Sequence, residues 1–212
     1  MAISNATPDD VLRFWFAGPV DDARHIAKRI KLWFGVDEAF DAEIRERFAG
    51  VLDLAIAHRF DDWSATAHGA LALIIVLDQF PRNIFRKTPR AFANDALALE
   101  WCRKGIVRGL DRELTLYERT FFYLPFEHAE DLADQDRCVR YYQDLLDTAS
   151  PDFREIAAFN VKSGEEHRDV IRRFGRFPHR NAILGRQSTS EELEWLEQNA
   201  SAWGQGPTGE PG

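Results

Sequence analysis

Apolar side chains recur along this chain at the spacing of an α-helix. Phe40, Ile44, Phe48, Val51 and Leu52 follow one stripe at positions i, i+4, i+8, i+11 and i+12. Such a stripe places its apolar side chains on one face of a helix. Runs that alternate between apolar and polar residues, which would predict β-strands, do not occur in the sequence. The pattern therefore predicts an all-α protein.

Helix starts are marked by hydroxyl residues followed by proline, at Thr7-Pro8, Thr88-Pro89 and Ser150-Pro151. A hydroxyl side chain caps the free N–H groups of a first turn, and proline fits the first helical position. Thr115 with Glu118, and Ser188 with Glu191, have the spacing of a capping box. Together with the apolar stripes, these signals predict helices over residues 8–16, 37–58, 64–79, 89–107, 116–123, 131–147, 151–174 and 189–199, with Gly109 and Gly175 as stops and Gly164 as a point where the long helix after residue 151 could divide.

Residues 70–77, with the sequence ALALIIVL, are apolar on every side. They predict a central helix that is buried all round, and a short buried strand is the alternative. Pro81 is expected to end this element in either case, because proline removes a backbone hydrogen bond. No repeat with a period of about 34 residues occurs, so the helices do not predict a regular repeat array.

The composition fits one folded domain. The chain has 212 residues, of which 45% are hydrophobic, and these include 16 Phe and 6 Trp. A chain of this size buries roughly 70% of its unfolded surface, so a large core is expected. We expect one all-helical domain over residues 1–199. Residues 200–212 are rich in glycine and proline and predict a flexible C-terminal tail.

Charge and cysteine content exclude several classes of protein. The formal net charge of −8 and the pI near 5.3 argue against a general nucleic-acid or membrane-binding surface. The sequence has no apolar run of about 18 residues and no signal-peptide pattern at its start. Cys102 and Cys138 lack the spacing of a disulfide framework or a thiolate metal site. We expect a cytoplasmic protein without nucleic-acid or membrane partners, and the oligomeric state stays open.

One segment reverses the charge of the chain. Residues 162–186 contain seven Lys and Arg and three acids, which gives a local charge of 7 − 3 = +4. Part of this segment, Phe177-Pro178-His179-Arg180-Asn181, is echoed by Phe80-Pro81-Arg82-Asn83 in residues 77–86. Buried arginines need anionic partners, so we expect several of these cations to line a cleft. A phosphate or carboxylate from outside the protein would complete the set through bidentate arginine contacts.

Asp78 is predicted to end the apolar helix, where a carboxylate opposes the helix dipole. A cation is therefore expected beside it, from Arg82, Arg86 or residues 176–180. A structural ion pair that holds the turn is the equally weighted alternative. The residues that we expect to bind a ligand are Asp78, Arg82, Asn83, Arg86, His128, Arg176, Arg180 and Asn181.

The candidates for acid–base chemistry are His167, His179 and Glu127. His167 shares a helical face with Val170 and Ile171, which turns its ring towards the interior. A core histidine with satisfied hydrogen bonds is the common outcome, but the arginines nearby also allow a role in holding an anion or moving a proton. Glu127 and His128 follow a bend that is expected at Pro125, so they could face the same cleft.

The other polar motifs favour structural roles. Ser163 lacks the surroundings of a nucleophile elbow or a phosphate loop, and a surface turn is the better interpretation. The acids at 127–136 are interpreted as a solvated helix start, and those at 191–197 as a solvated face. The rings of residues 121–126 predict core packing. Glu166 with Glu127 and His128 lacks the spacing of a metal motif, so neither a metal nor a cofactor is expected.

The longest distinctive phrases are LDQFPRNIFRKTPRAFANDALAL, ERTFFYLPFEHAED and HRDVIRRFGRFPHRNAILGRQSTSEELEWL, with Phe14-Trp15 and Leu32-Trp33-Phe34 upstream. In these phrases the chain resembles a bacterial family known as domain-of-unknown-function family 924, from about residue 8 to residue 198. The resemblance implies a tetratricopeptide-like all-helical fold of antiparallel helix pairs. It implies no reaction, cofactor or substrate.

The sequence thus favours a protein that binds a small anionic ligand, or an acidic peptide end, in a groove rich in Arg and His. Concave surfaces of tetratricopeptide-like proteins often bind ligands, and this step rests on analogy of fold. One alternative is an enzyme that acts on a phosphorylated or carboxylated metabolite, with a histidine as acid or base. The other is a purely structural network of buried ion pairs that locks the helices together.

Overall fold

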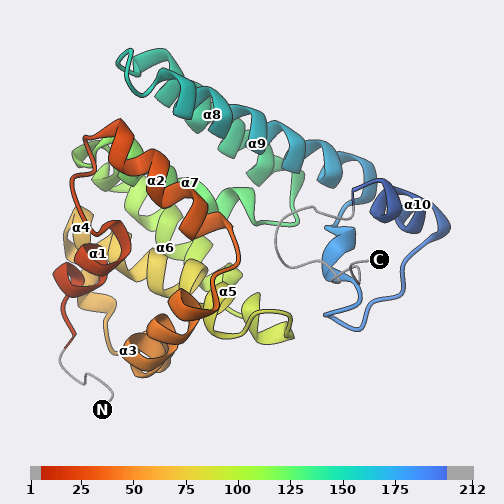
Figure 1. Cartoon of the computed structure of the whole chain (residues 1–212), viewed down its shortest axis with the longest axis horizontal. Helices are drawn as coiled ribbons and strands as arrows, with labels where there is room; N and C mark the ends of the chain where they lie inside the picture. The colour runs from red at the N-terminus through yellow and green to blue at the C-terminus, as the bar shows by residue number, and fades with distance from the viewer. Residues whose placement is uncertain (1–5, 200–212) are drawn as a thin grey trace.

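The computed structural model describes residues 6–199 of the chain. These residues form helices and turns, and no strand occurs among them, so the all-α prediction is confirmed (Figure 1). The longer helices are α1 (Pro8–Phe16), α2 (Ala23–Phe34), α3 (Glu38–Ile56), α4 (Ala67–Ile74), α6 (Asp95–Val107), α7 (Leu116–Glu127), α8 (Leu132–Thr148), α9 (Arg154–Phe174) and α10 (Ser190–Gln198). The short turns are η1 (Asp61–Ala65), η3 (Pro89–Ala91), η4 (Leu110–Glu113) and η5 (Pro178–Arg180).

Residues 70–77 form the centre of the core and are at most 1% exposed. The predicted helix is confirmed here and the alternative of a strand is wrong. The helical path runs on from α4 through a π-helical turn, η2 (Ile75–Gln79), into α5 (Phe80–Ile84). The expectation that Pro81 ends this element is therefore wrong. Pro81 lies in the first turn of α5, directly after the wider π turn, and proline is tolerated in a first turn.

Several other boundaries differ from the prediction. The Thr88-Pro89 pair starts only η3, and Ser150-Pro151 starts a turn that precedes α9. Gly164 does not divide α9, which ends at Gly175 in the left-handed conformation as predicted. The C-terminal capping box is formed by Thr189 and Glu192, one residue later than expected. Helix α7 continues through Pro125 to Glu127, beyond the predicted end at residue 123.

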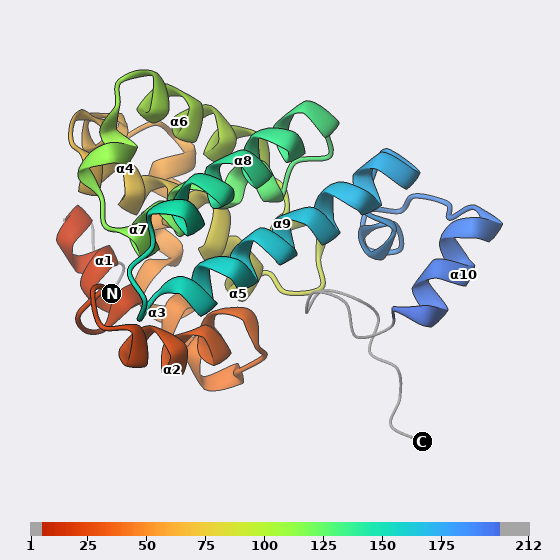
Figure 2. The ribbon, with the colours of Figure 1, turned by 90° about the horizontal axis from the view of Figure 1, so that it is seen from above.

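Helix α2 is absent from the sequence prediction. Its sequence carries apolar residues at helical spacing, Ile26, Ile30 and Trp33, and Asp22 caps its first turn through two backbone N–H groups. Figure 2 shows α2 near the beginning of α9, on the side of the molecule where α3 and α5 also lie. This placement matters because the end of α2 forms one wall of the pocket described below.

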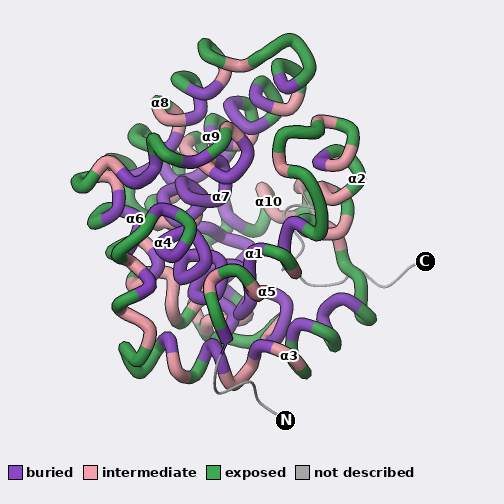
Figure 3. Tube along the Cα trace, turned by 90° about the vertical axis from the view of Figure 1, so that its left-hand side faces the viewer, coloured by how far each residue is buried: buried purple, intermediate pink, exposed green. Residues whose placement is uncertain are grey.

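Helices α8 and α9 lie side by side along much of their length, and α7 packs beneath α8 (Figures 1 and 2). The most deeply buried backbone runs through the middle of the molecule, where α4 and α7 lie (Figure 3). A second, smaller apolar cluster joins the end of α9 to α10 through Ile171, Phe177 and Trp195. We call residues 176–198 the C-terminal cap; they comprise η5, α10, the segment between them and the two residues before η5.

The tetratricopeptide-like pairing of helices stays a prediction. The predicted tail, residues 200–212, lies outside the described residues. Within residues 6–199, no helix combines the length and the apolar character that a membrane span requires.

Candidate functional site

A pocket of about 390 Å³ lies where α2, α5, α7 and α9 come together. Its apolar wall comes from the end of α2 and from α7 and α9, and its polar wall from the segment between Gln79 and Arg86 and from the facing side of α9. The residues on the apolar wall include Trp33, Phe34, Leu124 and Phe159. Those on the polar wall include Gln79, Arg82, Asn83, Arg86, Glu127, His128, Asn160, Lys162 and His167.

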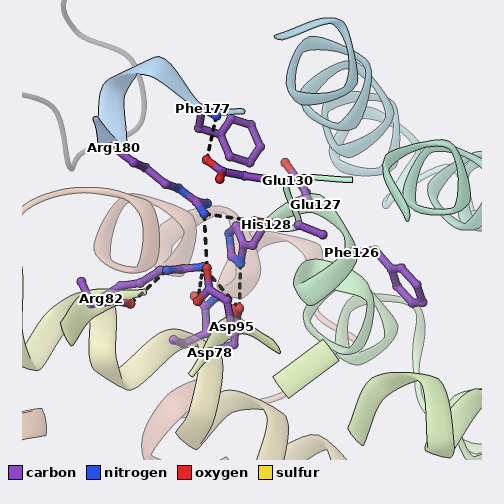
Figure 4. Close-up of polar contacts among 12 residues, drawn as sticks. Asp78, Arg82, Asp95, Phe126, Glu127, His128, Glu130, Phe177 and Arg180 are labelled. Atoms are coloured by element: carbon purple, nitrogen blue, oxygen red, sulfur yellow. Dashed lines mark hydrogen bonds and ion pairs between the residues drawn. The ribbon is translucent and has the colours of Figure 1, made fainter. Parts of the chain in front are cut away.

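Asp78 lies behind the polar wall and is fully buried. Its Oδ1 lies 2.8 Å from Nδ1 of His128 and 3.4 Å from Nη2 of Arg82, and its Oδ2 accepts a 2.5 Å bond from Gln79 (Figure 4). Burial alone would raise the pKa of Asp78, but the charges of His128 and Arg82 and these hydrogen bonds hold it below its usual range. The carboxylate is therefore ionised, and it fixes the orientation of His128.

A cation was expected beside Asp78 because a carboxylate at a helix end opposes the helix dipole. The cation is present, but this reason is wrong. The residue lies inside a continuous helical path and not at a helix end. Of the cations expected as partners, Arg82 bonds it, and Arg86 and Arg180 do not; His128 is its other partner. Arg180 reaches the same cluster through Asp95, whose two oxygens lie 3.1 Å from Arg82 and 3.3 Å from Arg180. The two echoing segments of the sequence therefore meet across Asp95 (Figure 4).

Glu127 forms a second buried cluster beside His128. Its Oε2 accepts a 2.7 Å bond from the Tyr142 hydroxyl, and its Oε1 accepts a 2.7 Å bond from Ser163 and lies 3.1 Å from Nδ1 of His167. Burial lowers the pKa of His167, and the charge of Glu127 opposes this shift only in part. Two predictions are wrong here, because Glu127 is 4% exposed and not solvated, and Ser163 lies within α9 and not in a surface turn.

Arg86 reaches the pocket from the end of α5. Its Nε and Nη2 donate to the two oxygens of Asp41, at 2.7 and 2.9 Å, and Asn83 donates to the same carboxylate at 2.8 Å. This arrangement uses one edge of the guanidinium. The remaining nitrogen of the guanidinium, Nη1, makes no hydrogen bond among the described residues. Nothing in the sequence pattern connects Asp41 with residues 83–86, so this part of the site could not be predicted.

The cations of residues 162–186 have carboxylate partners within the protein. Each of the seven lies within 4.0 Å of an acid, and most of these acids come from outside the segment. Arg176 pairs with Glu192, and Arg186 pairs with Glu130. The surplus of cations over acids within residues 162–186 is therefore no argument for an external anion. The acids of 127–136 and 191–197 that were interpreted as solvated supply several partners, and Asp134 and Glu192 are each 2% exposed.

Besides Asp78, four candidate residues lie away from the pocket lining: Arg176, His179, Arg180 and Asn181. Asn181 donates to Ser188 and Glu192 within the C-terminal cap. Burial lowers the pKa of Arg180 to about 10, and it lowers that of His179 to about 2 with a further contribution from Arg180. His179 is therefore neutral, and its position gives it no access to a ligand in the pocket.

The pocket does bring together six of the candidate residues: Arg82, Asn83, Arg86, Glu127, His128 and His167. Sequence reasoning missed the aromatic wall and Asn160, and it did not select Lys162 from the cations of residues 162–186 as a ligand-binding residue. Trp33 and Phe34 end the unpredicted helix α2, so a correct prediction of that helix would have indicated the wall. Among the described residues, no group of three His, Cys, Asp or Glu side chains has the arrangement of a metal site.

The fold and the pocket together define an all-helical protein with a pocket that is aromatic on one wall and polar on the other. The chain belongs to the bacterial protein family of unknown function DUF924, whose family model matches residues 11–200. The resemblance stated from the sequence is thus confirmed. No curated protein matches the chain. It is similar to a solved structure, the protein of unknown function ATU0120 from Agrobacterium tumefaciens, at 40% identity and a TM-score of 0.76, over 90% of this chain and 97% of that chain.

Proposed function

We propose that the protein binds a small anionic molecule in the pocket between α2, α5, α7 and α9. The observation that carries this proposal is the position of Arg86. Arg86 lines the pocket, and Asp41 holds its guanidinium by Nε and Nη2, so the cation is oriented before any ligand arrives. A guanidinium held in this way binds carboxylate or phosphate at a low entropic cost.

Two further features support a ligand of this kind. Lys162 lies on the same pocket with its side chain 74% exposed, and its nearest acid, Glu166, is 3.8 Å away. The pocket volume of about 390 Å³ falls in the range of small-molecule sites. Arg82 has a different role in this proposal, because it is committed to Asp78 and Asp95 and supports the wall from behind.

The proposal is tested by ligand-observed NMR with phosphate, succinate and acetate at matched ionic strength. Binding is expected to weaken about tenfold in Arg86→Lys, since the planar two-nitrogen contact with Asp41 and the orientation of Nη1 are lost. Lys162→Ala is expected to weaken binding by about threefold, as for a partly screened charge. Lys104→Ala is the matched control, because Lys104 is 53% exposed, pairs with a glutamate four residues away and lies off the pocket.

Equal binding by wild type, Arg86→Lys and Lys162→Ala would contradict the proposal. An absence of saturable binding for every anion would also contradict it. Binding at a site saturates with concentration, whereas the general effect of salts on a protein does not.

A second candidate function is an enzyme, and the Asp78–His128 pair favours it. A buried carboxylate on Nδ1 fixes the tautomer and the orientation of an imidazole, and leaves Nε2 to act on a ligand. In this hypothesis His128 replaces His179 as the acid or base, because His128 lines the pocket. His167 and Glu127 lie beside it and would supply a second proton-transfer pair.

The two functions are separated by following the bound compounds over time. NMR spectra of each binding anion are recorded during a long incubation with the protein at micromolar concentration. An enzyme is expected to convert a bound compound, and His128→Asn is expected to abolish conversion while binding remains. Unchanged spectra for every bound compound would favour binding alone.

A further inference from the structure

Three side-chain amides line the pocket, and the nitrogen of each donates a hydrogen bond within the protein. Gln79 donates to Asp78 at 2.5 Å, Asn83 donates to Asp41 at 2.8 Å, and Asn160 donates to Thr120 at 3.1 Å. All three amide residues are more than nine-tenths buried, with exposures of 5%, 4% and 8%. Each therefore has a fixed partner for its nitrogen on the protein side.

The orientation of two of these amides follows from chemistry. An ionised carboxylate only accepts hydrogen bonds, so Gln79 and Asn83 must present nitrogen to Asp78 and Asp41. Their carbonyl oxygens then point elsewhere. Among the described residues, no donor bonds to the side-chain oxygen of Gln79, Asn83 or Asn160. None of these three oxygens is enclosed by the protein, so a donor from a ligand or from water can reach each of them.

The opposite wall offers apolar surface that the protein does not cover. Phe34 is 48% exposed and Phe159 is 58% exposed, and both line the pocket together with Trp33. Large aromatic side chains release free energy when they are covered, in proportion to the apolar area removed from water. A ligand with an apolar or aromatic part would provide that cover.

We infer that the ligand is a free α-amino acid with an apolar or aromatic side chain. Its carboxylate can accept hydrogen bonds from Nη1 of Arg86. Its ammonium group has three donors and no acceptor, so it suits the three side-chain amide oxygens that no protein donor bonds. Its side chain matches the wall of Trp33, Phe34 and Phe159. This inference rests on the proposed function, because the carboxylate is the anion that the pocket was proposed to bind.

The test compares three probes of one shape by isothermal titration calorimetry: phenylalanine, 3-phenylpropionate, which lacks the amino group, and phenethylamine, which lacks the carboxylate. Phenylalanine is expected to bind about tenfold or more tightly than either, since hydrogen bonds to charged groups are the stronger ones. Glycine is expected to bind at least tenfold more weakly than phenylalanine, because it lacks the apolar part.

The outcomes separate the two levels of the proposal. If 3-phenylpropionate binds as tightly as phenylalanine, the inference is wrong and the anion site stands. The inference also fails alone if phosphate or succinate binds and none of the three probes does. If phenethylamine binds and no anion does, both the inference and the proposed function are wrong.

A pair of variants assigns the effect to a carbonyl oxygen. Asn160→Leu removes the oxygen at nearly the same volume, and is expected to reduce the preference for phenylalanine over 3-phenylpropionate by about threefold or more. Thr120→Val is the control, because it removes the same internal hydrogen bond and leaves the Asn160 oxygen in place. An equal loss of preference in both variants would show that the internal bond matters and not the oxygen, and would overturn this assignment. The comparison of probes on the wild-type protein does not depend on the folding of either variant.

Discussion

At the scale of single residues, Asp78 shows how a local rule can point to the right residue for the wrong reason. The sequence indicates an acid that needs a cation, and the structure gives it Arg82, one helical turn away, and His128 from α7. The supposed conflict with a helix dipole does not exist, because the helical path continues past Pro81. Asp78 needs these partners because it is completely buried, and no spacing of residues in the sequence shows this burial.

Replacement of Asp78 by alanine is expected to destabilise the protein by about 3 kcal/mol or more. The side chain is 1% exposed, and its loss leaves the His128 ring and one edge of Arg82 without a buried acceptor. Urea denaturation at pH 7 measures the change in the free energy of unfolding. A loss below about 1 kcal/mol would mean that water or Asp95 replaces the carboxylate with little cost.

His179 makes a prediction about pH. Burial and the charge of Arg180 lower its pKa to about 2 in the folded protein, whereas an unfolded histidine titrates near 6.5. Below pH 6.5 the unfolded state binds the extra proton, so stability falls as the pH falls. Between pH 6.5 and 5 the loss is about 2 kcal/mol for this residue, at about 1.4 kcal/mol per pH unit.

The contribution of His179 is isolated by urea denaturation of wild type and His179→Gln at pH 7, 6 and 5. His167 shifts in the same direction and contributes to both proteins, and carboxylates titrate mostly below this window. The variant is therefore expected to lose less stability than wild type between pH 6.5 and 5. Parallel pH profiles would show that His179 takes up a proton in the folded state.

At the scale of elements, start signals and apolar periods predicted most helices, and the errors have physical causes. Pro81 and Pro125 were expected to interrupt helices, but one lies in a first turn after a π turn, and the other lies within α7 at a fully packed position. Tertiary packing offsets the lost hydrogen bond in such places. The omission of α2 is different in kind, because its apolar spacing is present in the sequence.

Gly164 tests the contact between α8 and α9. A Cβ atom there would lie 3.2 Å from Tyr142 and 3.5 Å from Val139, so the two helices approach closely at this residue. Gly164→Leu is expected to destabilise by about 2 kcal/mol, since extra volume at a packed contact forces the helices apart. It should also displace the Tyr142 hydroxyl from Glu127.

Thermal and urea denaturation measure the effect of this substitution. Ala158→Leu is the matched control, because it adds similar volume on an exposed position of the same helix. Gly164→Ala is expected to change stability by less than about 1 kcal/mol, as the gain in helix propensity offsets the tight contact. Equal stability of Gly164→Leu and the control would mean that α8 and α9 can separate at little cost.

At the scale of the whole molecule, the balance of charge could not be predicted from the sequence. Residues 162–186 have a charge of +4 as a segment, but in the fold their arginines form ion pairs with Asp95, Glu130 and Glu192 from outside the segment. The sequence indicated that these cations need anionic partners and assigned the missing anions to a ligand, whereas the fold supplies carboxylates. The pocket depends on long-range contacts such as Arg86 with Asp41, which only the fold brings together.

Glu130 is one of the residues that hold the C-terminal cap to the rest of the molecule. It accepts a 2.8 Å bond from the backbone N–H of Phe177 and two bonds, of 2.6 and 2.9 Å, from Arg186. Burial raises the pKa of Glu130, but the Arg186 hydrogen bond and the Phe177 N–H outweigh this and keep the pKa below its ordinary value. Replacement by alanine would leave the N–H of Phe177, a fully buried residue, without its acceptor.

Glu130→Ala is therefore expected to loosen the cap before the core. Amide hydrogen exchange in residues 176–198 should become about tenfold faster or more, while residues 67–84 at the centre of the core keep their protection, because local opening needs less free energy than global unfolding. Glu113→Ala, at an exposed position, is the control and is expected to leave both regions unchanged. Exchange that accelerates equally in the cap and the core would show that the two unfold together, and unchanged exchange in the cap would show that apolar contacts such as Phe174 with Trp195 hold it without Glu130.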